Sequence, residues 1–141
     1  RWRDTLARLG GDEFGVLLEN CTVDEAIEAF SYPPLGKRSW WPQFGYGHDR
    51  SRERREYADW WNAHGVLVLQ LESVPAIVNV RKLAKPGVDM FAFGAADLGL
   101  SIEAHPKSPF ASFEECHDFV VEQCKDLEIK VGASTSQVGR M

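Results

Sequence analysis

Three polar side chains follow two short apolar runs, at positions where they can act on one ligand. Gln70 and Glu72 lie at the end of the run at residues 66–71, and Asp97 lies beyond the run at residues 88–93. Apolar runs of this length are typical of parallel strands buried on both faces. If these strands are neighbours, about 4.8 Å apart, Glu72 and Asp97 converge on one hard cation, Mg²⁺ or Mn²⁺, with Gln70 at the same edge.

The small residues Gly94, Ala95 and Ala96 precede Asp97. Small side chains let backbone N–H groups come close to an anion, and Asp97 would lie at the head of any helical turn that follows. A cation beside these amides suits a carboxylate next to a carbonyl group, as in pyruvate. The alternative is that Glu72 is a solvated strand-end residue and Asp97 an N-cap, because acidic residues are mostly exposed and Asp caps helices. The spacing alone does not decide.

The elements that must position these residues alternate between helix and strand from residue 51 onward. The patterns of apolar, capping and turn residues predict helices and strands in turn, at residues 51–63, 66–71, 75–85, 88–93, 112–127 and 129–131. This order with short links favours parallel strands joined by right-handed crossovers, an α/β fold.

The first 30 residues follow a different pattern. Residues 5–9 and 14–18 flank the turn residues Gly-Gly-Asp, which predicts a β-hairpin. Thr22 and Glu25 have the spacing of a capping box and predict a short helix that stops before a Pro-Pro pair. The predicted fold therefore adds an N-terminal β-hairpin and helix to the parallel α/β part.

Length, charge and cysteine usage exclude several classes of protein. The chain has 141 residues, and a complete (β/α)₈ barrel needs about 250. Lys and Arg number 16 against 21 Asp and Glu, a net charge of −5, so nothing favours nucleic acid or a membrane surface as partner. No apolar run approaches the length of a spanning helix and no signal peptide is recognisable, so we expect a cytoplasmic protein. The three cysteines form no disulfide or zinc pattern.

Four motifs in series resemble the HpcH/HpaI aldolase and citrate lyase β family. In order and spacing they are YPPLGKR at 32–38, LQLES at 69–73, PGVD at 86–89 and FGAADL at 93–98. The resemblance covers about residues 32–132, roughly the later half of that family's barrel. It therefore implies a partial TIM barrel with parallel strands.

The same resemblance implies a metal-dependent carbon–carbon lyase that acts on a pyruvate-type 2-oxo acid. Glu72 and Asp97 are then the ligands of Mg²⁺ or Mn²⁺, and Gln70 lies near the substrate oxygen. The amides of residues 94–96 hold the substrate carboxylate, and Arg38 lies on the substrate side. The family's general base belongs to the first half of the barrel, so no catalytic residue is assigned here and we expect binding before turnover.

A second motif, RLGGDEFGVLLE at residues 8–19, resembles the signature hairpin of the GGDEF diguanylate cyclase family. In that family the glycines let the backbone approach a guanine nucleotide, and the acidic residues serve metal binding and phosphoryl transfer. An Arg-x-x-Asp pair before the hairpin resembles the inhibitory cyclic di-GMP site. The corresponding residues are Arg1, Asp4, Gly10, Gly11, Asp12 and Glu13. One hairpin does not hold metal, nucleotide and nucleophile together, so we expect it to cover apolar surface.

The two resemblances predict a chimera, with a GGDEF-like fragment at 1–30, a partial barrel at 31–132 and a tail at 133–141. Three functions follow: a lyase or its ligand-binding remnant, a guanine nucleotide or cyclic di-GMP module, and an inactive fold that self-associates. The first is the function prediction. A partial barrel leaves strand edges open, so we also expect a homo-oligomer.

Aromatic and charged runs complete the candidates. Trp40-Trp41 and Trp60-Trp61 favour core or subunit contacts over ligand stacking. The run at residues 50–56 alternates both signs of charge, which favours a solvated helix face over a phosphate-binding patch.

Overall fold

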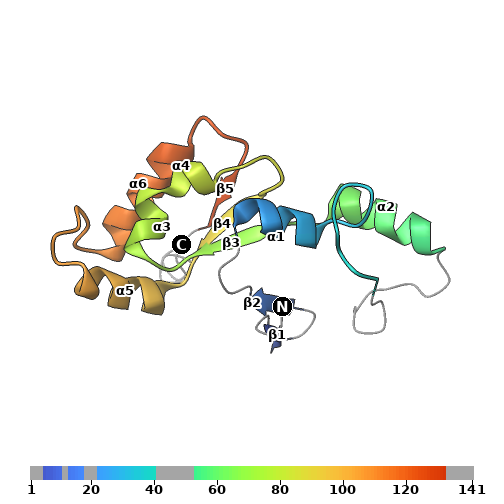
Figure 1. The fold of residues 1–141 in the computed structure, drawn as a ribbon. Helices are drawn as coiled ribbons and strands as arrows, with labels where there is room; N and C mark the ends of the chain where they lie inside the picture. Colours follow the sequence, from blue (N-terminus) through green and yellow to red (C-terminus); the bar gives the residue numbers. More distant parts are fainter. Residues whose placement is uncertain (1–4, 11–12, 18–21, 41–52, 133–141) are drawn as a thin grey trace, which may run out of the picture. The chain divides into compact units, whose positions relative to one another are not determined.

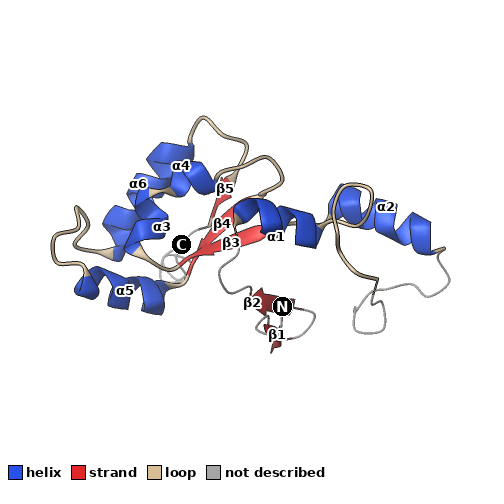
Figure 2. Cartoon of the chain, in the orientation of Figure 1, coloured by secondary structure: helices blue, strands red, loops and turns tan. Residues whose placement is uncertain are grey.

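The computed structural model describes residues 5–10, 13–17, 22–40 and 53–132. The chain forms two compact units, residues 1–65 and 66–141, and Figures 1 and 2 show their helices and strands. This division concerns compactness, so the boundary near residue 31 stays a prediction. No helix in the described part is long and apolar enough to cross a membrane.

The first unit begins with the predicted hairpin and helix. Strands β1 (Thr5–Gly10) and β2 (Glu13–Leu17) pair antiparallel, which confirms the hairpin. Helix α1 (Val23–Phe30) follows. The Glu25 N–H donates to the Thr22 hydroxyl at 3.2 Å, and the Thr22 N–H donates to the Glu25 carboxylate at 2.8 Å. This reciprocal pair is the predicted capping box.

Helix α2 (Arg54–His64) is held against the residues that follow α1. The Asn62 side chain accepts from the Tyr32 N–H at 2.8 Å and donates to the Tyr32 carbonyl at 3.0 Å. The Trp61 indole N–H donates to the Phe30 carbonyl at 2.9 Å. Gly65 is the C-cap of this helix. A Cβ atom at this position would lie 2.8 Å from the Phe30 ring, so a larger residue would collide with it. Side chains of α2 thus provide hydrogen-bond partners for three backbone groups about 30 residues earlier in the chain.

The second unit is built on a parallel sheet of three strands in the order β3 (Val68–Leu71), β4 (Met90–Phe93) and β5 (Lys130–Val131). Both neighbouring pairs are parallel. The α/β fold with parallel strands that the sequence predicts is therefore confirmed.

Four helices accompany this sheet: α3 (Val74–Val78), α4 (Val80–Leu83), α5 (Ala95–Ala104) and α6 (Phe113–Cys124). Helices α3, α4 and α6 pack together over one face of it (Figures 1 and 2). The most buried side chains come from both layers, each under 2% exposed: Leu71, Ile77, Val80, Phe91, Leu98, Cys116 and Val120.

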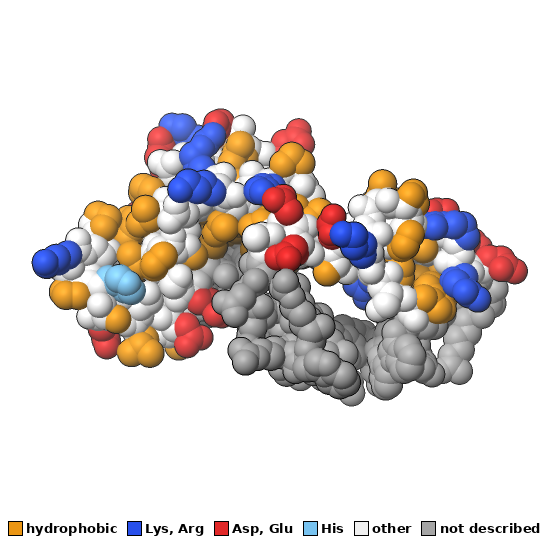
Figure 3. Space-filling model, viewed as in Figure 1, with side chains coloured by type: hydrophobic (Ala, Val, Ile, Leu, Met, Phe, Trp, Pro, Cys, Tyr) orange, Lys and Arg blue, Asp and Glu red, His pale blue; other side chains and the backbone are white. Residues whose placement is uncertain are grey.

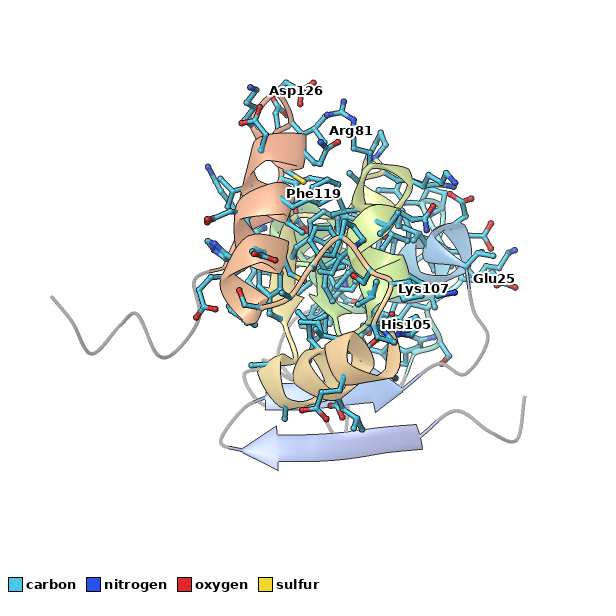
Figure 4. All side chains as sticks on the ribbon, turned by 90° about the vertical axis from the view of Figure 1, so that its left-hand side faces the viewer. Glu25, Arg81, His105, Lys107, Phe119 and Asp126 are labelled. Atoms are coloured by element: carbon cyan, nitrogen blue, oxygen red, sulfur yellow. The ribbon has the colours of Figure 1, made fainter. Side chains whose placement is uncertain are left out.

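An ion pair joins α4 to the end of α6 (Figure 4). The Arg81 guanidinium contacts the Asp126 carboxylate through two hydrogen bonds of 2.8 and 3.1 Å, and it also donates to the Gln123 carbonyl at 2.5 Å. This bidentate geometry holds the pKa of the Asp126 carboxyl below its usual value.

Several elements differ from the sequence prediction. The strand expected at residues 66–71 begins at Val68, and the helix α5 that follows Gly94 is longer than the single turn expected there. The single helix expected at residues 75–85 is divided into α3 and α4 at Asn79, whose backbone leaves the helical region (φ −98°, ψ 14°). Its side-chain amide donates to the Pro75 carbonyl at 2.8 Å and so caps the end of α3. The strand expected from residue 88 begins at Met90. Its neighbour Asp89 instead uses its carboxylate to accept the Leu67 N–H at 2.7 Å.

Candidate functional site

The carboxyl ends of β3 and β4 bring three of the predicted site residues together. The strands are in register with Gln70 beside Ala92, so Glu72 and Gly94 follow them at the same edge of the sheet. A methyl group at Gly94 would lie 2.6 Å from Cγ of Glu72 and 2.8 Å from Nε2 of Gln70. Both side chains therefore lie over Gly94, and a methyl group there would displace them.

Helix α5 starts directly after this glycine. Gly94 is its N-cap, and Ala95 and Ala96 are its first two residues. The first N–H groups of a helix have no acceptor within the helix and carry its partial positive charge. The site therefore has backbone donors beside the Glu72 and Gln70 side chains.

Asp97 is the third residue of α5, in its first turn. The alternative that Asp97 is an N-cap is therefore wrong, because Gly94 takes that position. An acidic side chain in the first turn complements the positive end of the helix. Asp97 and Glu72 are both exposed, so each can reach a ligand from solvent.

The donor set suits a hard divalent cation. Glu72 and Asp97 offer carboxylate oxygens, and Gln70 offers an amide. No group of three or more His, Cys, Asp or Glu side chains that could hold a metal ion occurs among the described residues. Mg²⁺ commonly takes only one or two protein carboxylates and completes its shell with water and substrate oxygens. The space that a Cβ would fill at Gly94 is compatible with such a partial site.

Arg38 lies in the first unit. Its guanidinium carbon is 4.2 Å from the centre of the Trp61 ring and 5.2 Å from that of Tyr32. The predicted place of Arg38 on the substrate side stays a prediction.

The nucleotide-binding prediction falls largely on residues outside the described ranges, namely Arg1, Asp4, Gly11 and Asp12. Gly10 and Glu13 are described, and they pair at the end of the hairpin.

Sequence reasoning missed a pocket in the first unit, between the segment after α1 and the start of α2. It has a volume of about 570 Å³, and aromatic and arginine side chains line it. In the sequence, the pocket is represented by Trp40 of the first Trp pair and by residues 53–55 of the charged run. Neither feature indicates a pocket by itself, because the two segments meet only in the fold.

Comparison with known proteins was informative at the level of structure. No family model and no curated protein matches the chain. An HpcH/HpaI aldolase from Desulfitobacterium hafniense DCB-2 superposes with a TM-score of 0.61 at 22% identity, over 80% of this chain and 45% of that one. An HpcH/HpaI aldolase/citrate lyase family protein from Burkholderia cenocepacia J2315 gives 0.61 at 25%, over 84% and 48%. Macrophomate synthase gives 0.60 at 22%, over 83% and 44%.

These similarities concern the fold. The chain spans a little under half the length of the solved structures that it matches. None of the comparisons supports the GGDEF resemblance or a chimera. The prediction of a partial barrel is confirmed: this chain has the α/β fold of about half of an HpcH/HpaI-type aldolase barrel.

Proposed function

We propose that this chain carries the metal- and 2-oxo-acid-binding end of a carbon–carbon lyase. The observation that carries the proposal is the position of Glu72 and Gln70 over Gly94, at the head of the helix whose first turn holds Asp97. The similarity of the fold to HpcH/HpaI aldolases supports it.

Each residue has a distinct task in this proposal. Glu72 and Asp97 hold Mg²⁺ or Mn²⁺, which when bound supplies Lewis-acid stabilisation to an oxygen that gains enolate charge. The backbone N–H groups of Ala95 and Ala96, the first two residues of α5, donate hydrogen bonds to the carboxylate of a small 2-oxo acid such as pyruvate. The N–H of Gly94 instead donates to the Leu71 carbonyl at 3.2 Å. Gln70 donates its amide N–H to a substrate oxygen.

Binding is the property to test in this chain. Deprotonation next to the carbonyl needs a positioned base, and the described site contains only the ligand set. We therefore assign turnover to a complete barrel and expect this chain to bind the cation together with a dicarboxylate that resembles an enolate.

The test is Mn²⁺ binding followed by electron paramagnetic resonance, with and without oxalate. We expect oxalate to strengthen Mn²⁺ binding to the parent chain, and Glu72→Gln to lose at least about tenfold of that affinity, because it removes one anionic oxygen ligand. Glu103→Gln is the matched control, since this exposed residue lies near the other end of α5. Absence of Mn²⁺ binding by the parent chain, or equal loss in both variants, would contradict the proposal.

A further inference from the structure

The pocket of the first unit has the size of a small-molecule site. Its volume of about 570 Å³ lies within the range of roughly 300 to 1,000 Å³ that is usual for ligand pockets. Every lining residue comes from the segment after α1 or from the start of α2 and the residue before it. Figure 3 shows hydrophobic side chains between Lys and Arg side chains on this part of the surface.

Aromatic rings form the rigid side of the pocket. Tyr32 is only 5% exposed, and its ring centre lies 5.8 Å from that of Trp40. Tyr57 contacts both rings edge-on, at 6.2 Å from Tyr32 and 5.7 Å from Trp40. Rings fixed by one another lose little further entropy when a planar ligand stacks on them.

The charged side of the pocket has an excess of positive charge. Arg38, Arg54 and Arg55 line it against the single carboxylate of Glu53, although the chain as a whole has a net charge of −5. Arg55 is already engaged, since it donates to the Pro33 carbonyl at 2.6 Å and pairs with an aspartate one helical turn on.

Arg38 and Arg54 keep their hydrogen-bonding capacity. The guanidinium of Arg54 lies 5.9 Å from the Trp40 ring centre, and that of Arg38 lies 4.2 Å from the Trp61 ring centre. Within the described part of the chain, neither guanidinium has a carboxylate partner. Stacking uses the flat face of a guanidinium and leaves its in-plane N–H groups for an anion.

We infer that this pocket binds a planar aromatic anion, an aromatic ring that carries a carboxylate or a phosphate. The ring stacks on Trp40, which Tyr32 and Tyr57 hold in place, and the anion accepts hydrogen bonds from Arg54 and Arg38. The sequence prediction of a solvated helix face agrees with the exposure of residues 53–56, and that of a packing role for Trp40 agrees with its ring contacts. The inference adds a ligand to both. This inference does not depend on the lyase proposal, because it uses none of the residues at the ends of β3 and β4.

Calorimetric titration of the full chain tests the inference with two anions and their uncharged analogues. The probes are 2-naphthoate against 2-naphthamide, and AMP against adenosine. We expect the preferred anion to bind at least about tenfold more tightly than its uncharged analogue, because the analogue leaves both guanidinium groups unpaired. The anion that binds more tightly identifies the site as one for carboxylates or for phosphates.

Substitutions locate the bound anion. Arg54→Gln is expected to weaken binding about tenfold, and Arg54→Lys to recover part of it, because Lys keeps the charge without the planar fork. Lys37→Gln is the matched control, since Lys37 neighbours Arg38 in the sequence but pairs at 2.6 Å with Glu28 outside the pocket. It is expected to leave the affinity unchanged.

The outcomes separate this inference from the lyase proposal. Glu72→Gln should leave the binding of 2-naphthoate and AMP unchanged while it weakens oxalate-enhanced Mn²⁺ binding at least about tenfold. Neither anion binding at about 1 mM, equal affinity for charged and uncharged probes, or no effect of Arg54→Gln would each overturn the aromatic-anion site. Circular dichroism of Arg54→Gln checks that α2 is intact, which its exposed position leads us to expect.

Discussion

The side chain of Glu72 lies so close to Gly94 that a methyl group there would come within 2.7 Å of the carboxylate Oε1. The Nε2 atom of Gln70 shares this crowded position, at 2.8 Å from the same point. Non-bonded carbon and oxygen atoms do not approach so closely without displacement. Glycine at position 94 therefore determines where the two polar side chains can lie.

We predict that Gly94→Ala weakens oxalate-enhanced Mn²⁺ binding by about tenfold without unfolding the protein. Glu72 and Gln70 are exposed and can move aside, so the loss falls on the site and not on the core. Electron paramagnetic resonance measures the affinity, and thermal unfolding measures the stability.

Gly99→Ala is the control within the same helix. A methyl group at Gly99 would meet nothing within 4 Å, so this variant should keep its affinity and gain about 0.5 to 1 kcal/mol from helix propensity. Equal effects of the two substitutions on Mn²⁺ binding would show that Gly94 has no special role.

The core of the second unit depends on Phe91, which is fully buried on the central strand. Phe91→Ala is expected to lower the free energy of unfolding of this unit by about 3 to 5 kcal/mol, because it removes apolar contacts and leaves a cavity. Leu100→Ala, at a position 66% exposed, should change it by no more than about 0.5 kcal/mol. Urea titrations followed by circular dichroism compare them, and similar costs would contradict this description of the core.

The Arg81–Asp126 pair predicts a pH dependence of stability. The hydrogen bond from Arg81 lowers the pKa of the Asp126 carboxyl below its usual value, so the folded state binds this proton more weakly than the unfolded state. The stabilisation is therefore complete above the unfolded pKa and is lost as the pH falls through the folded pKa.

Asp126→Asn should accordingly be less stable than the parent at neutral pH and equal to it in strong acid. Thermal unfolding from about pH 7 down to about pH 2 measures the difference, with Glu128→Gln as a control that leaves the pair intact. A difference that persists unchanged at the acid end would exclude the ion pair as its source.

The sheet of the second unit has two outer strands, and in the described residues neither the outer edge of β3 nor that of β5 is paired. We predict that the chain self-associates through such an edge, because unpaired strands present free backbone groups. Val68→Lys on β3 should shift the chain toward monomer in sedimentation velocity experiments. Val78→Lys, on α3 and similarly exposed (51% against 45%), should not, and a monomeric parent chain would contradict the prediction.

The sequence predicted the elements whose signals are local, that is, contained within a few neighbouring residues. The Thr22 capping box and the hairpin are each encoded within a few residues, and each is observed. The two strands are observed as well, but the expectation that both are buried on both faces is wrong for β3, where Val68 is 45% exposed. The break at Asn79 was missed because it lies inside a continuous apolar stripe and depends on the dihedral angles of one residue and on its side-chain hydrogen bond to Pro75. The full length of α5 was missed because Gly99 lowers its helix propensity.

The sequence predicted which residues belong to the candidate site and at which edge of the sheet they lie, but not how their side chains are arranged. Strand order brought Glu72 and Gln70 to the same edge as Gly94, which follows from parallel pairing alone. Their position directly over Gly94 could not be predicted, because it depends on the strand register and on side-chain directions. The pocket of the first unit was beyond the sequence for a similar reason, since it forms between Tyr32 and Arg54 in segments with no shared pattern.

The two cysteines of α6 allow the opening of the second unit to be followed by thiol labelling. Cys116 and Cys124 are 0% and 3% exposed, and burial raises the pKa of both thiols. Only the thiolate reacts with alkylating reagents, so both must await an opening of the helix layer before they are modified. All five Trp residues belong to residues 1–65. Indole fluorescence therefore follows residues 1–65, and thiol labelling follows the second unit once Cys21, the one cysteine of residues 1–65, is replaced by serine.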